Sequence, residues 1–174
     1  MPMPKKVLVL DTSILCCWLR VPGKDTAGPT DDLWDHDRIN GLLATEKDAG
    51  STFVLPIASL IETGNHISQS KGNCYQLAKK LTKCLTESIT SKSPWAAFTD
   101  QSSLWEAAKL QELADNWPSL AAGGTSIGDA TIKNVAEYYS SAGYTVEILT
   151  GDKGLKAYET SKPALTPRRR SATA

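Results

Sequence analysis

The chain has 174 residues, of which 41% are hydrophobic and 22% are charged, a composition typical of one globular domain and unlike that of a disordered protein. Lys and Arg total 19 and Asp and Glu total 19, so any binding of nucleic acid must depend on local patches or bound cations. No apolar stretch approaches the ~20 residues of a membrane span, and the four cysteines lack zinc-finger spacing.

The N-terminal third predicts a strand, two helices and a loop. Residues 7–10 form an apolar run that indicates a strand covered on both faces. Because this run breaks at Asp11, it argues against a signal peptide, and the unpaired pattern of cysteines favours a cytoplasmic protein with reduced thiols. A helix follows over 12–20, then a Pro- and Gly-containing loop over 21–30. Thr30 or Asp31 is expected to cap the next helix.

The middle of the chain predicts a strand followed by several helices. Residues 52–55 indicate a second strand, and Pro56 suits the first turn of the helix after it. Residues 74–90 and 102–117 repeat apolar side chains at helical spacing. We expect them to form a helical pair, joined by a turn near Ser93-Pro94 and packed on one edge of the domain.

The C-terminal third completes an alternating order of strands and helices. Ser126 opens a helix to about residue 142, a strand follows over 144–149, and a short helix follows over 153–160. The order predicts an α/β fold: a three-layer α/β/α sandwich with a central parallel sheet, plus the inserted helical pair at about 74–117. We expect one domain over 1–162 and a basic, flexible tail over 163–174, which contains Arg168-Arg169-Arg170.

Four acidic residues lie where they could converge through the fold: Asp11, Glu62, Asp129 and Asp152. Asp11 and Asp152 follow buried strands, at the sheet edge where open α/β proteins bind ligands. Each acid also has a structural interpretation. Asp11 could cap a helix, Glu62 could lie on a solvated helix face, Asp129 fits a helix-start pattern with Ser126, and Asp152 could be a turn residue.

Four segments resemble the PIN-domain family in content and order: residues 7–13, 56–62, 126–132 and 148–152. The resemblance implies a PIN-like nuclease fold and activity that depends on Mg²⁺ or Mn²⁺. Asp11, Glu62, Asp129 and Asp152 then take the family's four acidic positions and serve as both metal ligands and catalytic residues. The family's hydroxyl positions map onto Thr12 or Ser13 and onto Thr150.

His66 shares a helix face with Glu62, so it is a candidate second ligand or substrate contact, or else a surface histidine. The resemblance further implies an endoribonuclease of the VapC type, a toxin of a toxin–antitoxin or defence system. RNA would be its substrate, and a cognate antitoxin and a second copy of the chain its possible partners.

Mg²⁺ prefers oxygen ligands, which four carboxylates provide. No histidine pair is evident for activating a 2′-hydroxyl, so we expect hydrolysis to leave 5′-phosphate and 3′-hydroxyl ends. One alternative is a non-catalytic PIN-like scaffold that binds RNA or protein. Another is a haloacid-dehalogenase-type phosphohydrolase, which normally has a second acid where this chain has Ser13.

Overall fold

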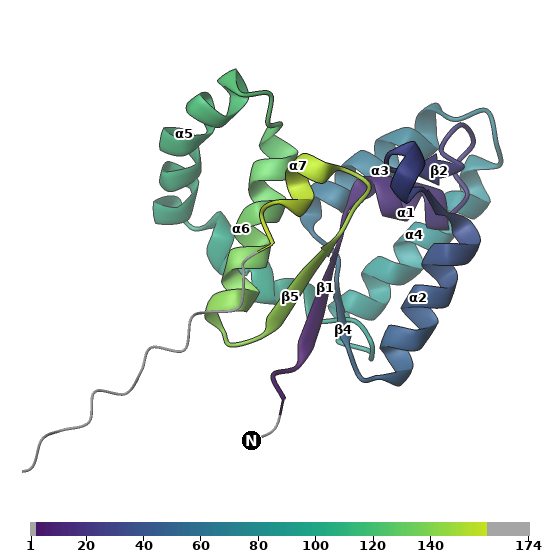
Figure 1. The fold of residues 1–174 in the computed structure, drawn as a ribbon, viewed down its shortest axis with the longest axis horizontal. Helices are drawn as coiled ribbons and strands as arrows, with labels where there is room; N and C mark the ends of the chain where they lie inside the picture. Colours follow the sequence, from purple (N-terminus) through teal and green to yellow (C-terminus); the bar gives the residue numbers. More distant parts are fainter. Residues whose placement is uncertain (1–2, 160–174) are drawn as a thin grey trace, which may run out of the picture.

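A three-stranded parallel sheet forms the centre of the molecule in a computed structural model that describes residues 3–159. The strands are β1 (Lys6–Leu10), β4 (Thr52–Val54) and β5 (Thr145–Leu149). Their order is β4-β1-β5, so the strand that begins the fold lies in the middle (Figure 1). The expected boundary at residue 162 and the basic tail at 163–174 lie outside the described residues.

Helices cover both faces of the sheet, whose central strand β1 is apolar and buried on both faces. They are α1 (Thr12–Trp18), α2 (His36–Asp48), α3 (Ile57–Gln69), α4 (Cys74–Ile89) and α6 (Ile127–Ser141). Along β1, Leu8 and Leu10 pack with residues of α1, α2 and α4, whereas Val7 and Val9 pack with residues of α6. The expected α/β fold with a central parallel sheet is confirmed, and the flanking helices are compatible with the expected three-layer sandwich. None of the described helices has the length and apolarity needed to cross a membrane.

The segment before α2 is more extended than the sequence predicts. Residues 26–27 (β2, Thr26–Ala27) pair antiparallel with 34–35 (β3, Trp34–Asp35), and Thr30–Asp32 forms only a short 3₁₀ turn between them. Helix α2 is therefore capped by Asp35, whose Oδ1 accepts a hydrogen bond from the Arg38 backbone N–H at 2.8 Å. The prediction of a cap at Thr30 or Asp31 is wrong, because the chain leaves the 3₁₀ turn as strand β3 and the helix begins only after Asp35.

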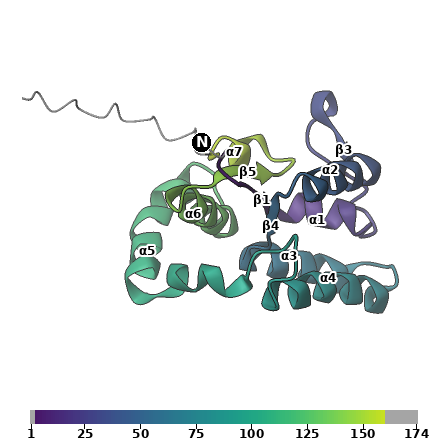
Figure 2. The ribbon, with the colours of Figure 1, turned by 90° about the horizontal axis from the view of Figure 1, so that it is seen from below.

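The two helices expected to form a pair lie on different sides of the molecule. Helix α4 packs against α3, whereas α5 (Ala107–Ala122) packs against α6. A 3₁₀ segment, η2 (Phe98–Trp105), connects the two regions, and Figure 2 shows α4 and α5 well separated. The prediction of one inserted pair over 74–117 is thus wrong in its packing. The two helices pack against different partners, α4 against α3 and α5 against α6.

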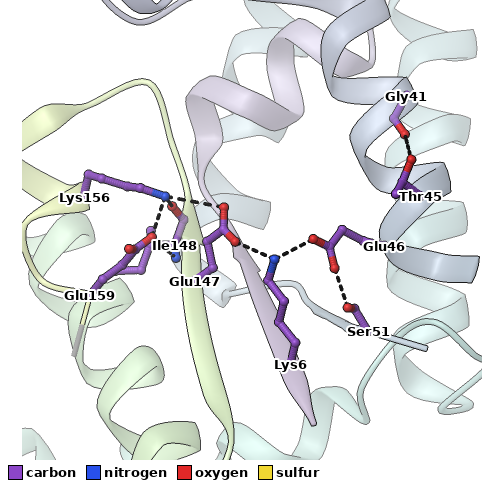
Figure 3. Close-up of polar contacts among 9 residues, drawn as sticks. All are labelled: Lys6, Gly41, Thr45, Glu46, Ser51, Glu147, Ile148, Lys156 and Glu159. Carbon is purple, nitrogen blue, oxygen red and sulfur yellow. Dashed lines mark hydrogen bonds and ion pairs between the residues drawn. The ribbon is translucent and has the colours of Figure 1, made fainter. Parts of the chain in front are cut away.

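Charged side chains near the start of β1 and along β5 join the sheet to its flanking helices (Figure 3). Lys6 on β1 binds Glu46 of α2 and Glu147 of β5. Burial alone would lower the pKa of Lys6, but hydrogen bonds to the two glutamates outweigh it and raise the pKa. At the outer edge of β5, the Ile148 N–H donates to Glu159 at 2.9 Å, so a side chain occupies this position of the strand edge.

Candidate functional site

The carboxyl ends of β1 and β5 form the edge of the sheet at which the four predicted acids meet. The chain passes from β1 to β4 on one side and later returns to β5 on the other, so strand order reverses here. Ligands of open α/β sheets bind at such a crevice. A cavity of about 390 Å³ opens at this edge, and its lining includes Asp11, Glu62, Asp129 and Asp152. All four predicted acids therefore line one pocket.

Asp11 is held by two hydroxyl groups and does not cap its helix. Its side chain is 6% exposed, and although it occupies the position before α1 it makes no capping hydrogen bond. Instead, Oδ2 accepts hydrogen bonds from Ser13 Oγ at 2.8 Å and from Thr150 Oγ1 at 2.7 Å. Since both hydroxyls bind the same oxygen, the carboxylate is fixed in one orientation within the pocket.

The hydroxyl groups link the two strand ends into one unit. Thr150 Oγ1 also accepts a hydrogen bond from the Asp152 N–H at 2.9 Å, and Ser13 Oγ accepts one from the Gly151 N–H at 3.1 Å. Thr12 takes a separate role, because its Oγ1 donates to Glu62 Oε2 at 2.9 Å. All three hydroxyl residues named from the sequence therefore contact an acid of the pocket.

Glu62 connects three helices. It extends from α3, accepts the hydrogen bond from Thr12 of α1, and lies against Gly128 in the first turn of α6. A Cβ atom added to Gly128 would lie 2.5 Å from Glu62 Oε1, so any other residue here would force this carboxylate to shift. Glu62 is half-buried, which differs from the solvated helix surface considered as its alternative.

Asp129 and Asp152 both lie at helix starts, but only the Asp152 side chain caps its helix. Ser126 Oγ accepts a hydrogen bond from the Asp129 N–H at 3.0 Å, which confirms the helix-start pattern. Burial raises the pKa of Asp129, and the negative charges of Asp11, Asp152 and Glu62 raise it further. Asp152 caps α7 (Lys153–Lys156) through hydrogen bonds from two backbone N–H groups, Gly154 at 2.7 Å and Leu155 at 3.3 Å.

The pocket has the donor chemistry for a hard cation but not a closed set of ligands. Its acidic oxygens suit Mg²⁺ or Mn²⁺. Within residues 3–159, however, no three His, Cys, Asp or Glu side chains are arranged as a metal-binding group. Glu62 Oε2 already accepts a hydrogen bond from Thr12 Oγ1, and Asp152 Oδ1 accepts one from the Gly154 N–H. Metal binding at this pocket stays a prediction.

The pocket also contains residues that the sequence did not single out. Lys24 adds a cationic side chain to the lining of the pocket. Gly28, in the same loop, packs tightly against Gly151: a Cβ atom added to Gly151 would lie 2.4 Å from the Gly28 nitrogen. Cys16 lines the pocket too, and burial raises the pKa of its thiol to about 11, which keeps it protonated at neutral pH. His66 also lines the pocket, as its spacing from Glu62 predicts. A loop contact such as Gly28–Gly151 leaves no local pattern in the sequence.

Comparisons with models of protein families, with curated proteins and with solved structures find no match to this chain. The resemblance to PIN domains therefore stays a prediction from the sequence. Function is argued below from the pocket and its residues.

Proposed function

We propose that this protein is an endoribonuclease that depends on Mg²⁺ or Mn²⁺ and hydrolyses phosphodiester bonds at the acidic pocket. One observation carries the proposal: four carboxylates from four separate segments line one cavity, and two hydroxyls orient the most buried of them, Asp11. In the proposed setting the protein is a cytoplasmic toxin of a toxin–antitoxin or defence system. RNA is then the substrate, and a cognate antitoxin and a second copy of the chain are partners.

The four carboxylates would hold the cation. When bound, a divalent ion supplies an activated water nucleophile and positive charge for the scissile phosphate. Asp11 would be the fixed ligand, because Ser13 and Thr150 hold its Oδ2. Asp129, whose pKa is raised by burial and by three neighbouring acids, would retain a proton more readily without the ion and release it on binding.

The expected products carry 5′-phosphate and 3′-hydroxyl ends. Activation of a 2′-hydroxyl normally needs a general acid and a general base close together. The chain has two histidines, and only His66 lines this pocket, whereas His36 lines a separate cavity beside α2. Detection of a 2′,3′-cyclic phosphate would contradict the proposed hydrolysis.

The test is cleavage of tRNA and mRNA with and without Mn²⁺, using the protein and two variants. Asp129→Asn should abolish cleavage. Asp115→Asn is the matched control, because Asp115 lies exposed on α5 and only accepts a hydrogen bond from Gln111, so it should cleave normally. Cleavage that persists in chelator, or in Asp129→Asn, would refute the assignment.

A non-catalytic PIN-like scaffold is the second candidate. It is favoured by the lack of a closed ligand group within the described part of the chain and by the capping role of Asp152. Such a scaffold would bind RNA or a protein without cleaving RNA. Its binding would also be indifferent to Mn²⁺ and to Asp129→Asn, which distinguishes it from the nuclease.

A further inference from the structure

A second and larger cavity, of about 480 Å³, lies between α2 and α4 and shares no lining residue with the acidic pocket. Its floor is aromatic: Trp18, Phe53 and Trp95 all line it. Phe53 and Trp95 meet edge to face with ring centroids 5.8 Å apart, and both are buried, whereas Trp18 is only half-buried. A cavity of this size with an apolar floor is typical of a small-molecule site.

The rim of this cavity is positively charged. Lys47 of α2 and both Lys80 and Lys83 of α4 line it, and all three are exposed. Among the ion pairs of the described residues, none involves these three lysines. The one acid of the lining, Glu87, is already paired with Lys92 at 3.6 Å. In a chain whose net charge is zero, this concentration of unpaired cations favours an anionic ligand.

Two polar groups at the start of α2 offer a hydrogen-bond acceptor and a donor. His36 Nδ1 lies 2.7 Å from the Trp18 carbonyl oxygen. Since a carbonyl only accepts, Nδ1 must donate, and in the neutral ring Nε2 is then an acceptor. Asn40 Oδ1 accepts a hydrogen bond from Trp18 Nε1 at 3.3 Å, so its amide NH₂ remains a donor. Both residues line the cavity.

We infer that this cavity binds a free nucleoside monophosphate. The base would lie on the aromatic floor, with its polar edge toward His36 and Asn40, and the phosphate would lie among Lys47, Lys80 and Lys83. Charge complementarity identifies the phosphate, and the paired donor and acceptor beside an aromatic surface identify the base. The inference does not depend on nuclease activity, because the two cavities are separate.

The test is isothermal titration calorimetry in chelator with adenosine 5′-monophosphate, adenosine and inorganic phosphate. The monophosphate should bind at least about tenfold more tightly than either part alone, since base and phosphate each contribute contacts. Lys80→Gln combined with Lys83→Gln should weaken it by about tenfold or more. Lys79→Gln is the matched control: Lys79 is also on α4 but lies over Tyr75, outside the cavity, and its loss should change nothing.

Three outcomes would overturn the inference. Phosphate alone could bind as tightly as the monophosphate, or Lys79→Gln could weaken binding as much as the double variant. A short 5′-phosphorylated oligonucleotide could also bind more tightly than the monophosphate and lose that affinity in the double variant, which would make an RNA end the occupant. Asp129→Asn should bind the monophosphate as tightly as the unaltered protein, which would show that the acidic pocket does not contribute to this binding.

Discussion

Substituting Gly128 by alanine tests whether the position of Glu62 matters to the candidate site. The added Cβ would lie 2.5 Å from Glu62 Oε1, so the carboxylate must retreat by about 1 Å to reach an ordinary contact of ~3.5 Å. The other oxygen of the same carboxylate, Oε2, accepts the 2.9 Å hydrogen bond from Thr12, so we expect the movement to disturb that bond. A displacement of ~1 Å in a catalytic group costs on the order of a hundredfold in rate.

Stability should change little in this variant. Replacing glycine by alanine within a helix stabilises by about 1 kcal/mol, whereas loss of one hydrogen bond costs about 1 kcal/mol. Gly41→Ala is the control, because Gly41 lies within α2 and a Cβ there would meet nothing within 4 Å. It should gain about 1 kcal/mol in urea unfolding and keep full activity.

The assay is single-turnover cleavage of RNA in Mn²⁺, beside urea unfolding in chelator. We expect Gly128→Ala to lose about a hundredfold in rate with stability near that of the unaltered protein. If Gly128→Ala cleaves normally and gains the same stability as Gly41→Ala, then the contact between Gly128 and Glu62 has no bearing on the site.

Two further substitutions test the hydrogen bonds and charges of the pocket. Thr150→Val removes the hydroxyl that donates to Asp11 and leaves the Asp152 N–H without its acceptor, so it should cost about 2 kcal/mol in urea unfolding. Thr45→Val is the control, because it loses only an exposed hydrogen bond to the Gly41 carbonyl, and it should lower the free energy of unfolding by less than about 0.5 kcal/mol. Equal losses in Thr150→Val and Thr45→Val would contradict a stabilising role for the Thr150 hydrogen bonds. Burial and neighbouring acids raise the pKa of Asp129 in the folded protein. Asp129 therefore contributes to folding stability below its pKa in the unfolded chain, and it loses this contribution as pH rises through its higher pKa in the folded protein. Asp129→Asn should therefore be more stable than the unaltered protein at pH 7 in chelator, by about 0.5 kcal/mol, and this difference in stability should shrink toward pH 4. A difference that grows at low pH would contradict the proposed repulsion between Asp129 and the neighbouring acids.

The sheet and the position of the acids could be predicted because their signals are local. The apolar run before Asp11 is buried on both faces in the structure, and Ser126 caps α6 as its spacing from Asp129 predicts. Parallel strands bring their carboxyl ends to one edge, so acids that follow two strands converge without further information.

What the sequence could not provide is the identity of contact partners. The apolar stripe of α5 predicts a helix that packs, but not that it packs on α6 while α4 packs on α3. Thr30, Asp31 and Asp35 all suit a helix cap, and only pairing between β2 and β3 selects Asp35. Whether Asp11 caps a helix or binds two hydroxyls depends on Thr150, which lies 139 positions away.

Thermal melting with and without Mn²⁺ tests most directly whether the four carboxylates hold a cation. A single ion at a hundredfold excess over its Kd adds about 2.7 kcal/mol, which raises the Tm of a chain of this size by roughly 5–10 °C. We predict such a rise in the unaltered protein and its absence in Asp11→Asn, which should also melt higher than the unaltered protein in chelator. A Tm that does not respond to Mn²⁺, or an equal rise in Asp11→Asn, would contradict the proposed cation site.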